Sequence, residues 1–246
     1  MESLSIIHEK NLTIDKDYQQ VKSNIQENLS EWSDLFVFDD KNNQIRYKTE
    51  GPLIPEDNSR IPVLILLSNP HPHSVKQGMF LSPNRIGREN PFWETLKGTG
   101  YFDYNGQIDA EVMIRNRYKS PFRFFMAVLL PFPSEDPSHL KELLGYNAYR
   151  KMYDQGRDSI HSMIMDHKIK NIICFGGLQY DAIAIGGSPN NYTSILSQGM
   201  IVKDTTKSHT STYVYLTFPT GWRYVKNFKV IKVKNFKNIL TYCQER

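Results

Sequence analysis

Cysteine is almost absent from this chain. Only Cys174 and Cys243 occur among its 246 residues, which excludes a disulfide framework and any zinc or iron–sulfur site built from four cysteines. Cys174 lies in an apolar run, so we expect a buried thiol that is a poor nucleophile. The low cysteine content favours a reducing compartment, and we expect a cytoplasmic protein.

Long apolar runs and several well-known motifs are also missing. No run approaches the roughly 18–20 residues that span a bilayer, and the first ten residues lack the pattern of a signal peptide, so we expect no membrane partner. The G-x-G-x-x-G, Walker and G-x-S-x-G patterns are absent, which argues against a dinucleotide site, a P-loop and a serine hydrolase. Gly176-Gly177 is interpreted as a tight strand-to-helix turn, with a phosphate site as the alternative.

The composition is that of an ordinary globular protein. Apolar residues make up 39% of the chain and charged residues 23%, enough to build a sizeable core. The formal net charge of +4 is only a weak indication of an anionic partner, and a simply solvated surface explains it as well.

The sequence divides near residue 58. Apolar residues recur at steps of three and four over 15–38, which predicts a helix, and 39–60 is polar and rich in turn residues. We therefore expect residues 1–58 to be an N-terminal helical extension and linker, followed by the main domain over 59–246.

The main domain alternates short apolar runs with helical periodicity. Val63–Leu67, 124–130, 171–175 and 213–218 are the expected buried strands. Between them, 146–167 and 177–185 have helical spacing or follow a strand directly. This alternation predicts an α/β fold with a short, mainly parallel central sheet, in which ligands bind beyond the carboxyl ends of the strands.

The most informative segment is 66–100. A buried strand ends at Asn69-Pro70, and a loop with His71, His73 and Phe80 follows. Asn90-Pro91 then has the residues that begin a helix, with Asn as the N-cap and Pro in the first turn.

This segment resembles the mismatch-specific uracil/thymine branch of the uracil-DNA glycosylase superfamily. The matching residues are Asn69, Pro70, Ser74, Gly78, Phe80, Asn90, Phe92, Trp93, Leu96 and Gly100. Residues 218–223 resemble the family's second strand-end loop more weakly, and residues 172–176 resemble its strand-Gly-helix unit more weakly still. The resemblance extends over about 60–243.

The resemblance implies a three-layer α/β/α fold and hydrolysis of the bond between a base and its deoxyribose, without a metal or an organic cofactor. These enzymes flip the target nucleotide out of the duplex. Carried over to this chain, Asn69 would position the attacking water. Pro70, His71, His73 and Phe80 would form the substrate pocket, with Phe80 stacking on the base. DNA would be the partner, contacted by Pro219, Thr220, Gly221, Trp222 and Arg223.

Two positions depart from the family pattern. His71 stands where the family has a small residue, and Phe218 stands where it has Asn or His, so a polar partner for the substrate is missing. Phe80 is also explained as a loop anchor in the core. His71 and His73 have no third ligand at suitable spacing, so we expect no metal site. The alternatives are a catalytically inactive relative that binds nucleic acid or a protein, and an unrelated α/β protein with a nucleotide at Gly176-Gly177.

Overall fold

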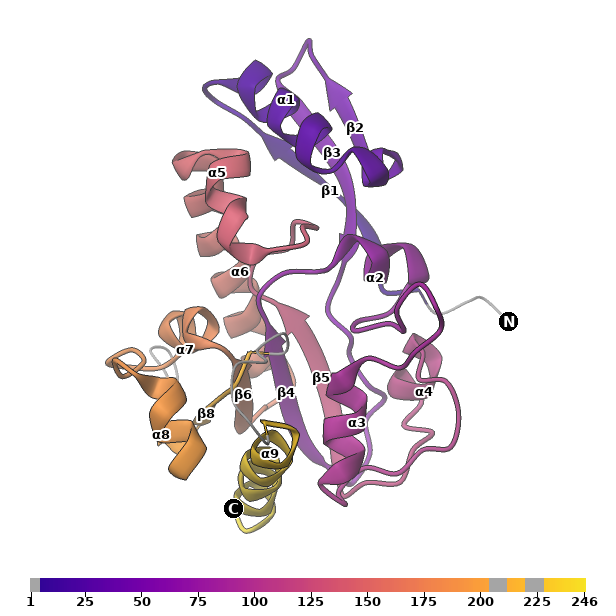
Figure 1. Cartoon of the computed structure of the whole chain (residues 1–246), viewed down its shortest axis with the longest axis vertical. Helices are drawn as coiled ribbons and strands as arrows, with labels where there is room; N and C mark the ends of the chain where they lie inside the picture. The colour runs from indigo at the N-terminus through magenta and orange to yellow at the C-terminus, as the bar shows by residue number, and fades with distance from the viewer. Residues whose placement is uncertain (1–4, 204–211, 220–227) are drawn as a thin grey trace.

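Two β-sheets organise the chain in the computed structural model, which describes residues 5–203, 212–219 and 228–246. Within these residues a three-stranded antiparallel sheet precedes a five-stranded, mostly parallel sheet. Figure 1 shows the small sheet at one end of the molecule and the large sheet toward the other. The fold is therefore mixed α/β, as the sequence predicts.

The N-terminal region differs from the expected helical extension. It consists of β1 (Ile7–Thr13), α1 (Tyr18–Asn28), the short 3-10 helix η1 (Ser30–Leu35), β2 (Phe36–Asp39) and β3 (Gln44–Glu50). The strands pair in the order β1-β3-β2. The expectation of one helix over 15–38 is correct only for its first part, and the expected polar connection contains β3. The buried Ile45 and Tyr47 of β3 alternate with the exposed Arg46 and Lys48, which is the period of a strand with one solvated face.

The four strands expected in the main domain are all present. They are β4 (Ile61–Leu67), β5 (Phe122–Val128), β6 (Asn171–Phe175) and β8 (Tyr213–Thr217), and the short β7 (Ile201–Lys203) adds an antiparallel edge. The sheet order is β5-β4-β6-β8-β7. After β4 the chain thus forms β5 on one side of β4, and it then returns to form β6 on the other side.

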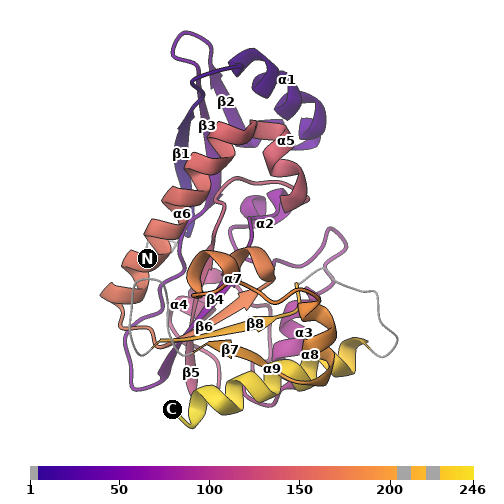
Figure 2. The same ribbon diagram turned by 90° about the vertical axis from the view of Figure 1, so that its left-hand side faces the viewer.

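Helices connect and cover these strands. After β4 come α2 (Pro72–Gln77), α3 (Pro91–Gly98) and α4 (Ala110–Ile114), and after β5 come η2 (Pro137–His139), α5 (Leu140–Leu144) and α6 (Tyr146–Asp166). The remaining helices are α7 (Gly177–Ile183), α8 (Tyr192–Gln198) and α9 (Phe228–Gln244). Figure 2 shows α6 extending from the small sheet along one side of the molecule, and α9 crossing the opposite end.

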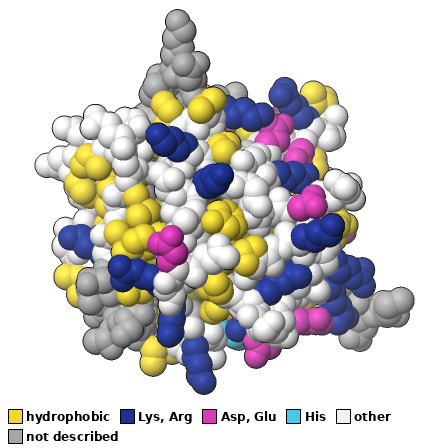
Figure 3. Space-filling view, turned by 90° about the horizontal axis from the view of Figure 1, so that it is seen from below, with side chains coloured by type: hydrophobic (Ala, Val, Ile, Leu, Met, Phe, Trp, Pro, Cys, Tyr) yellow, Lys and Arg dark blue, Asp and Glu magenta, His cyan; other side chains and the backbone are white. Residues whose placement is uncertain are grey.

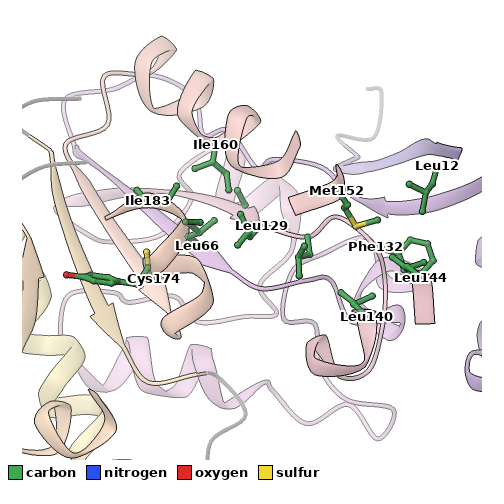
Figure 4. Close-up of a cluster of buried hydrophobic side chains, with 14 of the residues drawn as sticks. Leu12, Leu66, Leu129, Phe132, Leu140, Leu144, Met152, Ile160, Cys174 and Ile183 are labelled. Carbon is green, nitrogen blue, oxygen red and sulfur yellow. The ribbon is translucent and has the colours of Figure 1, made fainter. Parts of the chain in front are cut away.

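The large sheet buries both faces. Alternate residues of β4 enter two different clusters: Leu64 and Leu66 enter one, and Val63, Ile65 and Leu67 enter the other. The first cluster includes side chains of α5, α6 and α7, and the second includes side chains of α3, α4 and α9. Figure 4 shows part of the first cluster. It extends into the small sheet through residues such as Leu12, so the N-terminal region shares a core with the main domain.

Local sequence explains how two helices are placed. Asn90 is the N-cap of α3, as expected, and its side chain accepts a hydrogen bond from the Phe92 amide at 3.0 Å. In α6, Gly156 lies against the end of β5. A Cβ at this position would be 1.8 Å from the Leu129 carbonyl oxygen, so only glycine permits this close approach.

Two surface properties bear on partners. Among the described residues, none of the helices combines the length and hydropathy needed to cross a membrane. Figure 3 views the end of the molecule opposite the small sheet, where Lys and Arg side chains are spread among hydrophobic and a few acidic ones.

Candidate functional site

A polar cleft of about 660 Å³ lies at the carboxyl ends of the parallel strands. Its lining comes from the ends of β3, β4 and β6 and from the segments that follow β4, β5 and β8: Glu50, Leu67, Ser68, Asn69, His71, His73, Ser74, Leu81, Ser82, Asn84, Asn90, Ser134, Glu135, Asp136, Pro137, Phe175 and Pro219. Because β4 has β5 on one side and β6 on the other, the cleft lies where α/β sheets characteristically bind ligands. Its volume is in the range of small-molecule sites.

Asn69 lies two residues after the end of β4 and is held in one orientation. Its Nδ2 donates to the Ser134 carbonyl oxygen at 2.8 Å, to Ser134 Oγ at 3.0 Å and to the Pro70 carbonyl oxygen at 3.2 Å. The Ser134 amide in turn donates to the Pro70 carbonyl oxygen at 3.1 Å. Within the described chain nothing donates to Asn69 Oδ1, so the amide keeps a fixed acceptor for a molecule in the cleft. Pro70 is buried and serves this scaffold without lining the cleft.

His71 and His73, the two histidines expected in the substrate pocket, both line the cleft. His71 is the N-cap of α2, and its Nδ1 accepts from the His73 amide at 3.1 Å, which leaves the ring proton on Nε2. Partial desolvation lowers the pKa of His71; Glu135 opposes this shift, while His73 and Arg85 add to it. His71 is therefore a neutral donor near pH 7. The His73 ring lies 2.8 Å from the Pro83 carbonyl oxygen, to which its Nε2 donates.

Trp32, from η1, packs against the side chains of His71 and His73. Its ring meets both imidazoles edge-on, with centroids 6.3 Å apart in each pair. Its Nε1 donates to Glu135 Oε1 at 3.2 Å, which connects it to the opposite wall of the cleft. The cations of Lys76 and Arg85 each lie 5.0 Å from the Trp32 ring. The N-terminal region therefore helps to form the site, a role that the sequence did not indicate.

Phe80 is not in the cleft, which corrects the stacking role expected for it. Its ring is fully buried in the core beside α3, so no base can stack on it in this conformation. The aromatic side chain that does line the cleft is the half-buried Phe175, at the end of β6. The sequence does contain a signal for Phe175 as a residue of the site, because Phe175 ends a predicted strand immediately before Gly176. Leu81, next to Phe80, also lines the cleft.

The second family-like loop is described only in part. Pro219, which is expected to contact DNA, lines the cleft. Thr220, Gly221, Trp222 and Arg223 lie outside the described residues. Phe218 is 1% exposed and lines a different, small pocket beside α3 and α9, so it neither blocks the cleft nor contributes to it.

The turn at Gly176 is occupied by protein atoms. Gly176 has a φ of 130°, which favours glycine, and a Cβ there would contact Gln179 and Pro219. With its amide oriented so that both groups are satisfied, Gln179 donates to the Gly176 carbonyl at 3.1 Å and accepts from the Ser68 amide at 2.6 Å. This buried bridge ties the ends of β6 and β4 together. It favours the tight-turn interpretation over a phosphate site.

Glu50 is the lining residue that sequence reasoning missed most clearly. It ends β3, a strand that was not predicted, and its side chain is 2% exposed. Burial raises the pKa of Glu50 well above its ordinary value. No pattern in the sequence marks this glutamate as different from its neighbours.

The described residues contain no group of three or more His, Cys, Asp and Glu side chains arranged to hold a metal ion. The sequence matches no family model and no curated protein. The cleft itself is therefore the feature that points to a function.

Proposed function

We propose that this protein is a DNA glycosylase that hydrolyses the N-glycosidic bond of uracil or a related damaged base. The observation that carries the proposal is the fixed amide of Asn69, which lines a polar cleft and keeps Oδ1 as an acceptor. A water molecule that donates to Oδ1 would be aimed at a sugar carbon held in the cleft. The resemblance of 66–100 to the uracil/thymine-DNA glycosylase branch assigns this same role to Asn69.

The chemistry of Asn69 restricts the reaction. An amide orients water but is too weak a base to remove its proton early, so the bond to the base must break first. Uracil suits such a reaction because its ring stabilises the departing charge. Phe175 offers a face for the flipped base, and stacking of this kind contributes about 1–3 kcal/mol per base.

The family's three-layer arrangement is part of the same proposal. Its support is the pair of hydrophobic clusters on the two faces of the large sheet, each with its own helices. We also place the activity in the cytoplasm, where free thiols such as Cys174 and Cys243 persist.

DNA is the proposed partner, and Pro219 is its first point of contact at the mouth of the cleft. The Pro219 carbonyl accepts a hydrogen bond from Lys232 Nζ at 3.2 Å, which brings a cation of α9 to this loop. Phosphate groups favour such positions. His71, a neutral donor on the cleft wall, would interact with the substrate rather than with the backbone of the duplex.

A catalytically inactive relative is the second candidate, and specific observations favour it. Neither Phe80 nor Phe218 reaches the cleft, so two positions that contact the base in the family are not available here. Such a protein would bind nucleic acid or a protein partner without releasing a base.

A base-release assay tests the proposal. Purified protein is incubated with labelled oligonucleotides that carry uracil opposite G, opposite A or in a single strand, and alkali then cleaves abasic sites. We expect cleavage by the wild type and a loss of about 10²-fold or more in Asn69→Ala, with DNA affinity retained. Asn28→Ala, which changes an exposed asparagine at the end of α1, is the control and should match the wild type.

The outcomes separate the two candidates. DNA binding without base release from any of the three substrates would favour the inactive relative. Base release that is equal in Asn69→Ala and the wild type would reject the role of Asn69. If the protein shows no base release and no DNA binding, DNA is rejected as the partner.

A further inference from the structure

Glu50 is a cleft-lining residue whose carboxyl group has no role in the reaction proposed above. Its Oε1 is buried and has no hydrogen-bond partner among the described residues. The same side chain lines the cleft together with Asn69 and Ser134. Buried polar atoms are nearly always paired, because leaving one unpaired costs free energy. An acceptor or donor in the cleft would relieve this cost.

The surroundings of Glu50 favour its uncharged form. The other titratable groups that line the cleft are His71, His73, Glu135 and Asp136. Lys10, from β1, lines a cavity of about 30 Å³ on another side of Glu50, but it forms no ion pair with Glu50 in the described structure. Burial is the only cause that shifts the pKa of Glu50, and it raises the value well above 4.5. A carboxylic acid that is desolvated by burial can donate its O–H near neutral pH.

The proposed reaction needs such a donor. When the glycosidic bond breaks, its electron pair remains on the base, and charge that develops in a closed site is stabilised by a donor already in position. In the family-like second loop this polar partner is replaced by Phe218, which is buried outside the cleft. The donor must therefore come from another element: His71 offers its Nε2–H on the cleft wall, and β3 supplies a carboxyl group in Glu50.

We infer that Glu50 is the general acid of this site and gives its carboxyl proton to the departing base. The inference depends on the proposed function. The bond between the sugar carbon and the base nitrogen breaks, the electron pair goes to the base, and the Glu50 proton neutralises it. The water held by Asn69 forms the new carbon–oxygen bond, and the proton it loses returns through solvent to the Glu50 carboxylate.

Kinetics with two leaving groups test this role. Glu50→Gln keeps the size and polarity of the side chain but cannot transfer a proton. We expect kcat for uracil release to fall by about 10²-fold with little change in KM, since proton transfer contributes rate factors of this size. With 5-fluorouracil as the leaving base, whose anion is more stable, the loss should be much smaller. The wild-type rate should also fall as pH rises through the raised pKa of Glu50, whereas the variant should lose this dependence.

Glu9→Gln is the matched control. Glu9 is an exposed carboxyl on β1 of the same small sheet, where it lies 3.8 Å from Arg46, and it is not part of the cleft lining. This variant should release both bases at the wild-type rate. Circular dichroism and urea unfolding of both variants verify that the fold is unchanged.

Infrared difference spectroscopy of wild type against Glu50→Gln gives a reading that needs no substrate. The carbonyl band of an uncharged carboxylic acid at neutral pH is expected, and the band of a carboxylate would overturn the inference. Base release by the wild type that is equally fast in Glu50→Gln would overturn the role of Glu50 alone. No base release by the wild type would reject the proposed function, and the acid role would be rejected with it.

Discussion

Replacing Gly156 by alanine tests the packing that supports the cleft. The new methyl carbon would lie 1.8 Å from the Leu129 carbonyl oxygen, and real Cβ atoms essentially never approach closer than 3.0 Å. Either α6 or the end of β5 must therefore move by more than an ångström. Overpacking of this kind costs about 1–3 kcal/mol, while alanine in a helix interior recovers up to about 1 kcal/mol relative to glycine. Because the obstacle is backbone rather than a mobile side chain, we expect a net loss of about 1–2 kcal/mol.

Urea unfolding followed by circular dichroism measures this loss, which corresponds to a fall in Tm of about 2–8 °C for a chain of this size. Gly98→Ala, at the end of α3, is the control. Its methyl group would meet the side chain of Val233, whose nearest carbon would lie at 3.1 Å, so a shift of a few tenths of an ångström accommodates it. The reasoning would be refuted if Gly156→Ala were as stable as the wild type. Since Leu129 leads to Ser134, which holds Asn69, the variant should also lose base release.

Three further predictions concern stability and binding. Because burial raises the folded-state pKa of Glu50 above 4.5, the wild type loses stability as pH rises from that value through the raised pKa, and Glu50→Gln does not. Urea unfolding at about pH 5 and about pH 8 should therefore show that the free energy of unfolding falls more in the wild type than in the variant as the pH rises. Burial also raises the pKa of Cys174 and, to about 12, that of Cys243, so a thiol reagent should label neither until the protein is unfolded. Finally, DNA affinity measured by fluorescence anisotropy should fall steeply with salt, and a flat response would contradict phosphate contacts.

The main sheet could be predicted from the sequence because its strands are buried on both faces. Val63–Leu67 and 172–175 are continuous apolar runs, and polar or turn residues bound them, so their identity as strands does not depend on distant contacts. Asn69 could be predicted for the same reason, since it lies two residues after the end of such a run. Helix α3 had a local signal of its own in Asn90-Pro91.

The small sheet could not be predicted in the same way. In β1 only Leu12 is buried, and the side chains of β3 alternate between core and solvent in a segment rich in charge. Such strands are stabilised by pairing with one another and by packing against α1, and neither is visible in a local window. The prediction that Phe80 rather than Phe175 lines the site was wrong for a similar reason. Phe80 follows α2 and Phe175 ends β6, and the burial of Phe80 depends on tertiary packing in the cluster that includes α3.

The missed strand matters because it changes the composition of the site. Without β3, the cleft would be lined by main-domain residues alone, and its carboxyl groups would be those of Glu135 and Asp136. With β3 in place, Glu50 adds a buried carboxyl group to the lining of the cleft, and Trp32 donates a hydrogen bond to Glu135. The N-terminal region then supplies a reacting group and a support, so the two parts of the chain are required together. A buried carboxyl without a partner is tolerated where a substrate supplies the missing contact, and its place here is the strongest indication that the cleft is used.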